Sequence, residues 1–150
     1  MNYKLLLIAI VSIVFACNEA ENHNSREAAA KAEKSPADSL YDLVDKLHME
    51  GMAKAGKLKI AIGQTQKALD SLAKLPAKKI DKVYQQSLTE LKEELSYADN
   101  AMFTWMTEFK DSFKDNEQRV KYLQAEKEKV TKVRDNILHS LQRADSLLKK

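Results

Sequence analysis

The sequence has few of the residues that interrupt or cross-link a chain: two prolines, three glycines and one cysteine in 150 residues. A single cysteine cannot form a disulfide within the chain, and so few helix breakers favour long helices. A Gly-rich phosphate loop is also absent. The three histidines, at positions 23, 48 and 139, have no recognised catalytic or zinc-binding spacing. The sequence therefore predicts a protein that is not an enzyme.

An excess of charge of one sign is also missing. The chain has 25 basic and 22 acidic residues, and its formal net charge is +3. Both signs are interspersed, so no basic patch indicates a nucleic-acid partner. Charged residues nevertheless make up 31% of the chain, a composition typical of long, solvated helices.

Only one long apolar run is present, from Leu5 to Phe15 near the amino terminus. It is too short for a permanent membrane span, and Lys4 before it is typical of an export signal. Ala16 and Cys17 follow, and "VFAC" resembles the lipobox at which bacterial lipoproteins are cut before a lipidated cysteine. An ordinary signal peptide would leave a free thiol outside the cytoplasm. We therefore predict a signal peptide at 1–16 and lipidation of Cys17, which would anchor the protein to the outer or inner membrane of a bacterial envelope.

The next segment, 17–34, has no large apolar residue after the cysteine. Such a segment cannot bury a core, so we predict a flexible tether. Its "EAAAK" at 27–31 is the repeat of a semi-rigid helical spacer.

The remaining residues, 35–150, predict an all-α domain. Ser35 and Pro36 favour a helix start, Pro76 ends that helix after residue 75, and Asp115 favours a third start. The predicted helices are 35–75, about 77–114 and 115–150. Each has an apolar stripe with spacings of three and four residues, in which Lys127 is a polar exception. We expect an antiparallel three-helix bundle with coiled-coil-like heptad seams.

Methionine and tryptophan gather in two places. His48 and Met52 are four residues apart, as are Met102 and Met106, with the only tryptophan, Trp105, beside the second pair. If the first two helices fold back about Pro76, these two segments lie at the same level. Two interpretations remain open: ordinary packing, since methionine fills irregular gaps, and a site for Cu(I) or Ag(I) with His48, Met52, Met102 and Met106 as ligands.

These residues also carry a resemblance. "HMEGMAKA" at 48–55 and the pattern Asp99, Ala101, Met102, Trp105, Met106, Phe109 resemble small Bacteroidota lipoproteins of the "viral A-type inclusion protein" group. The resemblance implies a helical, membrane-anchored protein and supplies no catalytic residues. Ala55 and Phe103 stand where that group has further methionines, so two potential sulfur ligands are absent.

Together these features predict a lipoprotein of the bacterial envelope that acts as a non-enzymatic protein-binding or structural module. Its expected partners are the membrane, through the lipid anchor, and an envelope protein, with no nucleic acid. The alternative function is soft-metal binding or buffering through the His/Met/Trp cluster, with Cu(I) as the cofactor.

Overall fold

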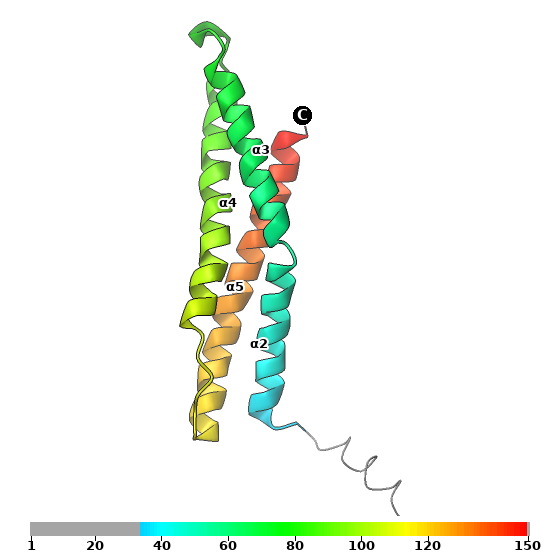
Figure 1. Cartoon of the computed structure of the whole chain (residues 1–150), viewed down its shortest axis with the longest axis vertical. Helices are drawn as coiled ribbons and strands as arrows, with labels where there is room; N and C mark the ends of the chain where they lie inside the picture. Colours follow the sequence, from blue (N-terminus) through cyan, green and yellow to red (C-terminus); the bar gives the residue numbers. More distant parts are fainter. Residues whose placement is uncertain (1–33, 150) are drawn as a thin grey trace, which may run out of the picture. The chain divides into compact units, whose positions relative to one another are not determined.

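The computed structural model describes residues 34–149, which form helices and short connections with no strand among them. The chain is therefore all-α in the part that the structure describes, as expected. The helices are α2 (Pro36–Met52), α3 (Ala55–Ala73), the 3₁₀ helix η2 (Ala77–Lys79), α4 (Lys82–Glu108) and α5 (Asn116–Leu148) (Figure 1). The predictions for the signal peptide, the lipidated Cys17 and the tether lie outside the described residues.

The predicted helix starts at Ser35 and Asp115 are confirmed. The Ser35 hydroxyl accepts a hydrogen bond from the Asp38 backbone N–H at 3.1 Å, and Pro36 is the first helical residue. The Asp115 carboxylate accepts from the Gln118 N–H at 2.8 Å. Both side chains satisfy a backbone donor that the first helical turn leaves unpaired.

The predicted single helix over 35–75 is wrong in one respect, because it is divided at Ala53 and Lys54 into α2 and α3. There the Lys54 N–H bonds to the Gly51 carbonyl at 2.9 Å, a tighter 3₁₀-type bond. Both Ala53 and Lys54 keep right-handed helical dihedral angles, so the chain bends without reversing.

The second helix also starts later than predicted. Ile80 is extended, and the Asp81 carboxylate accepts hydrogen bonds from the N–H groups of Val83 and Tyr84 at 3.0 and 3.1 Å. Asp81 is therefore the N-cap of α4, and α4 ends at Glu108 because Phe109 is extended. The segment after it is held to α5 by the Tyr122 hydroxyl, which accepts from the Lys110 N–H at 2.8 Å.

The core contains the residues of the predicted apolar stripes. The fully or almost fully buried members are Val44, Leu47, Leu58, Leu88, Leu91, Leu95, Ala98, Met102, Trp105, Leu123, Val130, Ile137 and Ala144. One prediction about the apolar stripe of the third helix is wrong. Glu126 is buried at 3% exposure, whereas Lys127 lies only partly buried, so the polar position in this stripe is one residue earlier than expected.

The bend between α2 and α3 coincides with a change of neighbour. Helix α2 packs mainly on α5 and barely touches α4, whereas α3 packs mainly on α4 and less on α5 (Figure 1). Helices α4 and α5 contact each other extensively. Because α2 and α3 pack on different neighbours, grooves are left between α2 and α4 and between α3 and α5.

Candidate functional site

The groove between α2 and α4 contains the residues of the predicted His/Met/Trp cluster. Two adjoining pockets, of about 230 and 260 Å³, lie along it. One is lined by Tyr41, Val44, Asp45, His48, Trp105, Met106 and Phe109, and the other by residues that include Met52, Met102, Phe103 and Met106. Met106 lines both. We call these two pockets together the methionine groove.

His48 and Trp105 lie side by side, as predicted by counting residues in both directions from Pro76. Their ring centroids are 5.3 Å apart with the planes tilted by 41°. His48 Nδ1 lies 3.9 Å from the Asp45 Oδ1 one turn earlier in α2. His48 Nε2 is buried and has no hydrogen-bond partner among the described residues. One polar atom in this groove is therefore unsatisfied.

Trp105 is 7% exposed, and its ring orientation is determined by Glu126 of α5. The indole Nε1–H donates to Glu126 Oε2 at 2.9 Å, and Lys129 Nζ lies 2.8 Å from Glu126 Oε1. This carboxylate raises the pKa of the Lys129 ammonium, through a hydrogen bond and then through charge. Sequence reasoning missed Glu126. The signal available was an acidic residue three positions after Leu123 in an apolar stripe.

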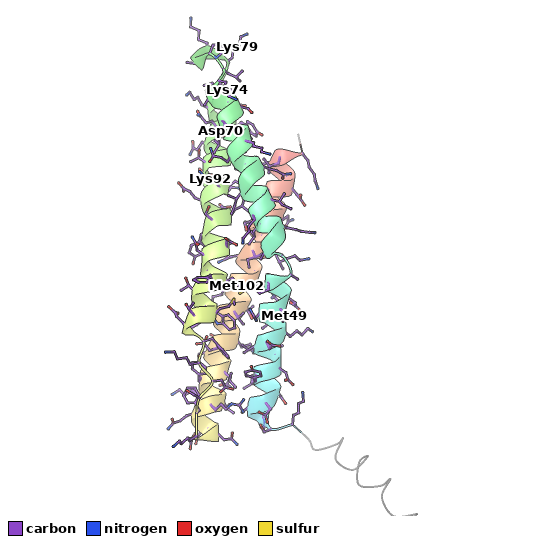
Figure 2. The ribbon with its side chains drawn as sticks, viewed as in Figure 1. Met49, Asp70, Lys74, Lys79, Lys92 and Met102 are labelled. Atoms are coloured by element: carbon purple, nitrogen blue, oxygen red, sulfur yellow. The ribbon has the colours of Figure 1, made fainter. Side chains whose placement is uncertain are left out.

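Met102 is held by packing. It is 4% exposed, and a Cβ atom added to Gly51 would lie 2.3 Å from Met102 Cε and 3.5 Å from Ile137 Cδ1. Gly51 therefore leaves the space that the Met102 side chain occupies beside α2. Figure 2 shows Met102 on α4 and Met49 on α2 at nearly the same level.

The other two methionines of the cluster are open to solvent. Met52 is 37% exposed and Met106 is 42% exposed, so neither is needed to fill the core. The structure thus brings all four predicted ligands to one groove but gives Met102 a separate packing role. Within residues 34–149 no group of three or more His, Cys, Asp or Glu side chains is placed to hold a metal ion.

The groove between α3 and α5 is larger, at about 880 Å³, and the sequence did not indicate it. We call it the α3–α5 groove. Its apolar lining residues are Ile60, Ala61, Ala68, Tyr84, Leu138, Leu141, Ala144 and Leu148, and its polar ones are Lys54, Lys57, Gln64, Gln142, Asp145 and Lys149. Ile60 is 62% exposed and Leu138 is 42% exposed, although both are large aliphatic side chains.

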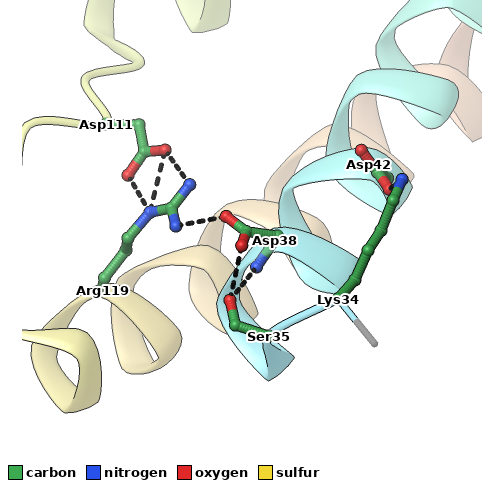
Figure 3. A network of polar contacts seen from close by, with 6 residues as sticks. All are labelled: Lys34, Ser35, Asp38, Asp42, Asp111 and Arg119. Atoms are coloured by element: carbon green, nitrogen blue, oxygen red, sulfur yellow. Dashed lines mark hydrogen bonds and ion pairs between the residues drawn. The ribbon is translucent and has the colours of Figure 1, made fainter. Parts of the chain in front are cut away.

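Ion pairs near the start of α2 join it to α5 and to the segment after α4. Arg119 forms two hydrogen bonds to Asp111 through Nε and one through Nη2, and its Nη1 lies 2.7 Å from Asp38 Oδ1 (Figure 3). The Arg119 hydrogen bond, and then that of Ser35, holds the pKa of Asp38 below its ordinary value. The two carboxylates raise the pKa of the Arg119 guanidinium. These contacts connect the start of α2, the segment after α4 and the start of α5.

Comparison with family models, with curated proteins and with solved structures gave no match for this chain. None of the helices that the structure describes combines the length and the apolar character that a membrane crossing requires.

Proposed function

We propose that this protein is a non-enzymatic, lipid-anchored module of the bacterial envelope that binds a helical segment of a protein partner in the α3–α5 groove. The anchor is the diacylated Cys17, left at the amino terminus when residues 1–16 are removed. The observation that carries the binding function is the exposure of Ile60 and Leu138 in a groove of about 880 Å³.

In this proposal the helical domain is an antiparallel three-helix bundle with coiled-coil-like seams, in which α2 and α3 together form the first helix. The spacing of buried residues in α4 supports it: Leu88, Leu91, Leu95, Ala98, Met102 and Trp105 follow intervals of three and four. Such a bundle is a rigid scaffold on which a partner can bind without a large rearrangement of the backbone.

The shape and lining of the α3–α5 groove fit an amphipathic helix. Its lining combines small buried side chains such as Ala61 and Ala144 with exposed aliphatic side chains such as Ile60. An amphipathic helix places apolar anchors at i, i+3, i+4 and i+7 into such a groove. The partner would cover Ile60 and Leu138, which removes apolar surface from water.

The charges around this groove indicate an acidic partner. Lys54 and Lys57 line it, and neither forms an ion pair among the described residues. Lys149 is paired with Asp145 at 3.2 Å, so these two charges largely cancel. Complementary charge increases the association rate and selects between partners.

The test uses two labelled helical peptides with the same leucine face, one with a Glu-rich and one with a Lys-rich polar face. We expect the acidic peptide to bind the protein and the basic peptide to bind at least roughly tenfold more weakly, with the difference falling as salt rises. Ile60→Ser combined with Leu138→Ser should abolish binding of the acidic peptide.

The matched control is Val83→Ser on α4. Val83 is 76% exposed and lines neither groove, so this variant loses an exposed aliphatic residue elsewhere. It should bind the acidic peptide like the parent. Equal binding by all three proteins, or no binding to the parent at all, would contradict the proposed function.

A further inference from the structure

The unsatisfied Nε2 atom of His48 suggests a second use of the molecule, independent of the α3–α5 groove. A neutral imidazole has one nitrogen that carries a proton and one that has a lone pair. The Asp45 carboxylate, 3.9 Å from Nδ1, favours the proton on Nδ1 and leaves the lone pair on Nε2. Nε2 is buried and has no hydrogen-bond partner among the described residues. At 3.9 Å the Asp45 carboxylate is beyond hydrogen-bond distance of Nδ1, and a small rotation of its side chain would give the carboxylate–histidine pair found behind metal-binding imidazoles.

Besides the Asp45 carboxylate, sulfur donors lie near His48. Met106 lines the same pocket as His48, and Met52 lines the adjoining pocket with Met106. Thioether sulfur is a soft, uncharged ligand that selects Cu(I)-like ions, and imidazole also suits copper. Hard cations would need several carboxylates, and residues 34–149 bring no three acidic, histidine or cysteine side chains together.

The exposure of these methionines decides which of them are available as ligands. Met52 and Met106 are 37% and 42% exposed, so their flexible side chains can turn toward a bound ion without opening the core. Met102 is 4% exposed and occupies the space left by Gly51, so it cannot turn toward an ion in the groove without leaving that space empty. Core packing therefore accounts for a methionine at position 102, but it does not account for the exposed methionines at positions 52 and 106.

Trp105 is the aromatic neighbour of His48 in this groove. Its Nε1–H is held by Glu126, which keeps the indole in place beside His48, with 5.3 Å between ring centroids. An indole face attracts a cation within about 6 Å of its centroid. An ion on His48 Nε2 would therefore lie close to an aromatic ring that is already fixed in position.

We propose that the methionine groove binds a soft monovalent cation, Cu(I) or Ag(I), through His48 Nε2 and the sulfur atoms of Met52 and Met106. Asp45 is a positioning residue that orients the imidazole. Met102 and Trp105 line the groove beside these ligands. Binding involves no change of oxidation state in the protein.

The test is a titration of the full chain with Ag(I), and with Cu(I) under a reductant, followed through Trp105, the only tryptophan. Every protein carries Cys17→Ser, so that no thiol competes for the ion. We expect quenching of the indole emission that saturates at one ion per chain. Met52→Leu combined with Met106→Leu should abolish this quenching, because it removes both thioethers at nearly constant volume.

Two further variants separate a built site from exposed sulfur in general. Met49→Leu removes a methionine that is 58% exposed and lines neither pocket, so it should bind like the parent. Asp45→Asn should weaken binding by about 10–100-fold while the helix content stays the same, as expected for an outer residue. X-ray absorption should show nitrogen and sulfur around the bound ion.

The proposal is overturned if the parent shows no one-to-one quenching, or if Met49→Leu weakens binding as much as the double variant does. It is also overturned if X-ray absorption shows no sulfur ligand. His48→Gln should lose most of the affinity. Should that variant lose helix content, the Met52→Leu/Met106→Leu double variant still decides the outcome.

Discussion

Trp105 depends on one carboxylate for its hydrogen bond. Both Trp105 and Glu126 are buried, and the contact between Nε1 and Oε2 is 2.9 Å. A hydrogen bond to a charged group in such surroundings is stronger than one in water. Without Glu126 the buried indole N–H would have no acceptor, whereas without Trp105 the Glu126 carboxylate would still have its contact with Lys129. The same bond keeps the indole beside His48, so it connects the stability of the fold with the geometry of the methionine groove.

We expect Glu126→Leu to lower the free energy of unfolding by about 1–3 kcal/mol, because it leaves the indole N–H buried without an acceptor. Trp105→Phe should also destabilise the protein. Together the two changes should cost less than the sum of the single costs, since no polar atom is then left unpaired. Urea unfolding of the four proteins measures this coupling, and simple additivity would show that the bond contributes nothing.

The ion pair between Asp38 and Arg119 predicts a dependence of stability on pH. The Arg119 and Ser35 hydrogen bonds lower the pKa of Asp38 from its ordinary value of 3.8. Its contribution to stability is therefore present above pH 3.8 and is lost as the pH falls through the lowered value. Asp38→Asn should show a smaller loss of stability than the parent when the pH is lowered below about 4. Urea midpoints at several pH values test this, and parallel curves would contradict it. Because Asp38 lies at the surface, the difference should be small.

At the scale of the elements, the bend between α2 and α3 determines where the grooves lie. On one side of the bend α2 packs mainly on α5, and on the other side α3 packs mainly on α4, so each leaves the remaining helix partly uncovered. The methionine groove and the α3–α5 groove are both consequences of this arrangement.

Gly51 and Gly63 give a paired prediction. Gly63→Ala, inside α3, should raise the free energy of unfolding by about 0.5–1 kcal/mol, because alanine favours the helix and the new Cβ meets nothing within 4 Å. Gly51→Ala should show no such gain, since its Cβ would lie 2.3 Å from Met102 Cε and the buried side chain must move. Thermal or urea unfolding compares the two, and an equal gain at both positions would mean that Met102 does not pack there.

At the scale of the whole molecule, the proposed function includes attachment to a membrane surface. In the proposed function the attachment depends on the lipid at Cys17. Several acyl chains, each contributing about 0.8 kcal/mol per buried CH₂, would hold it there stably.

We therefore expect Cys17→Ser either to release the protein from the membrane fraction or to leave it uncut, with residues 1–16 still attached. Membrane fractionation and the mass of the purified chain distinguish these results from the parent. A Cys17→Ser protein that is cut and remains in the membrane fraction like the parent would show that the cysteine is not the anchor.

The sequence alone determined the features that depend on neighbouring residues. Ser35, Pro36 and Asp115 predicted helix starts because a cap acts on backbone groups within one turn. Apolar spacing predicted that Leu91 and Leu95 are buried, because a helix has a fixed period. Counting residues along two helices joined near Pro76 also predicted that His48 lies close to Trp105.

Only the tertiary structure decided the features that depend on residues far apart in the chain. No proline in the sequence predicts the bend at Ala53 and Lys54. The bend lies between α2, which packs mainly on α5, and α3, which packs mainly on α4. The burial of Glu126 depends on a tryptophan 21 residues earlier that presents its N–H to α5. The α3–α5 groove could not be predicted from the sequence either. Each of the two helices can be predicted separately, but the groove arises because they contact each other only weakly.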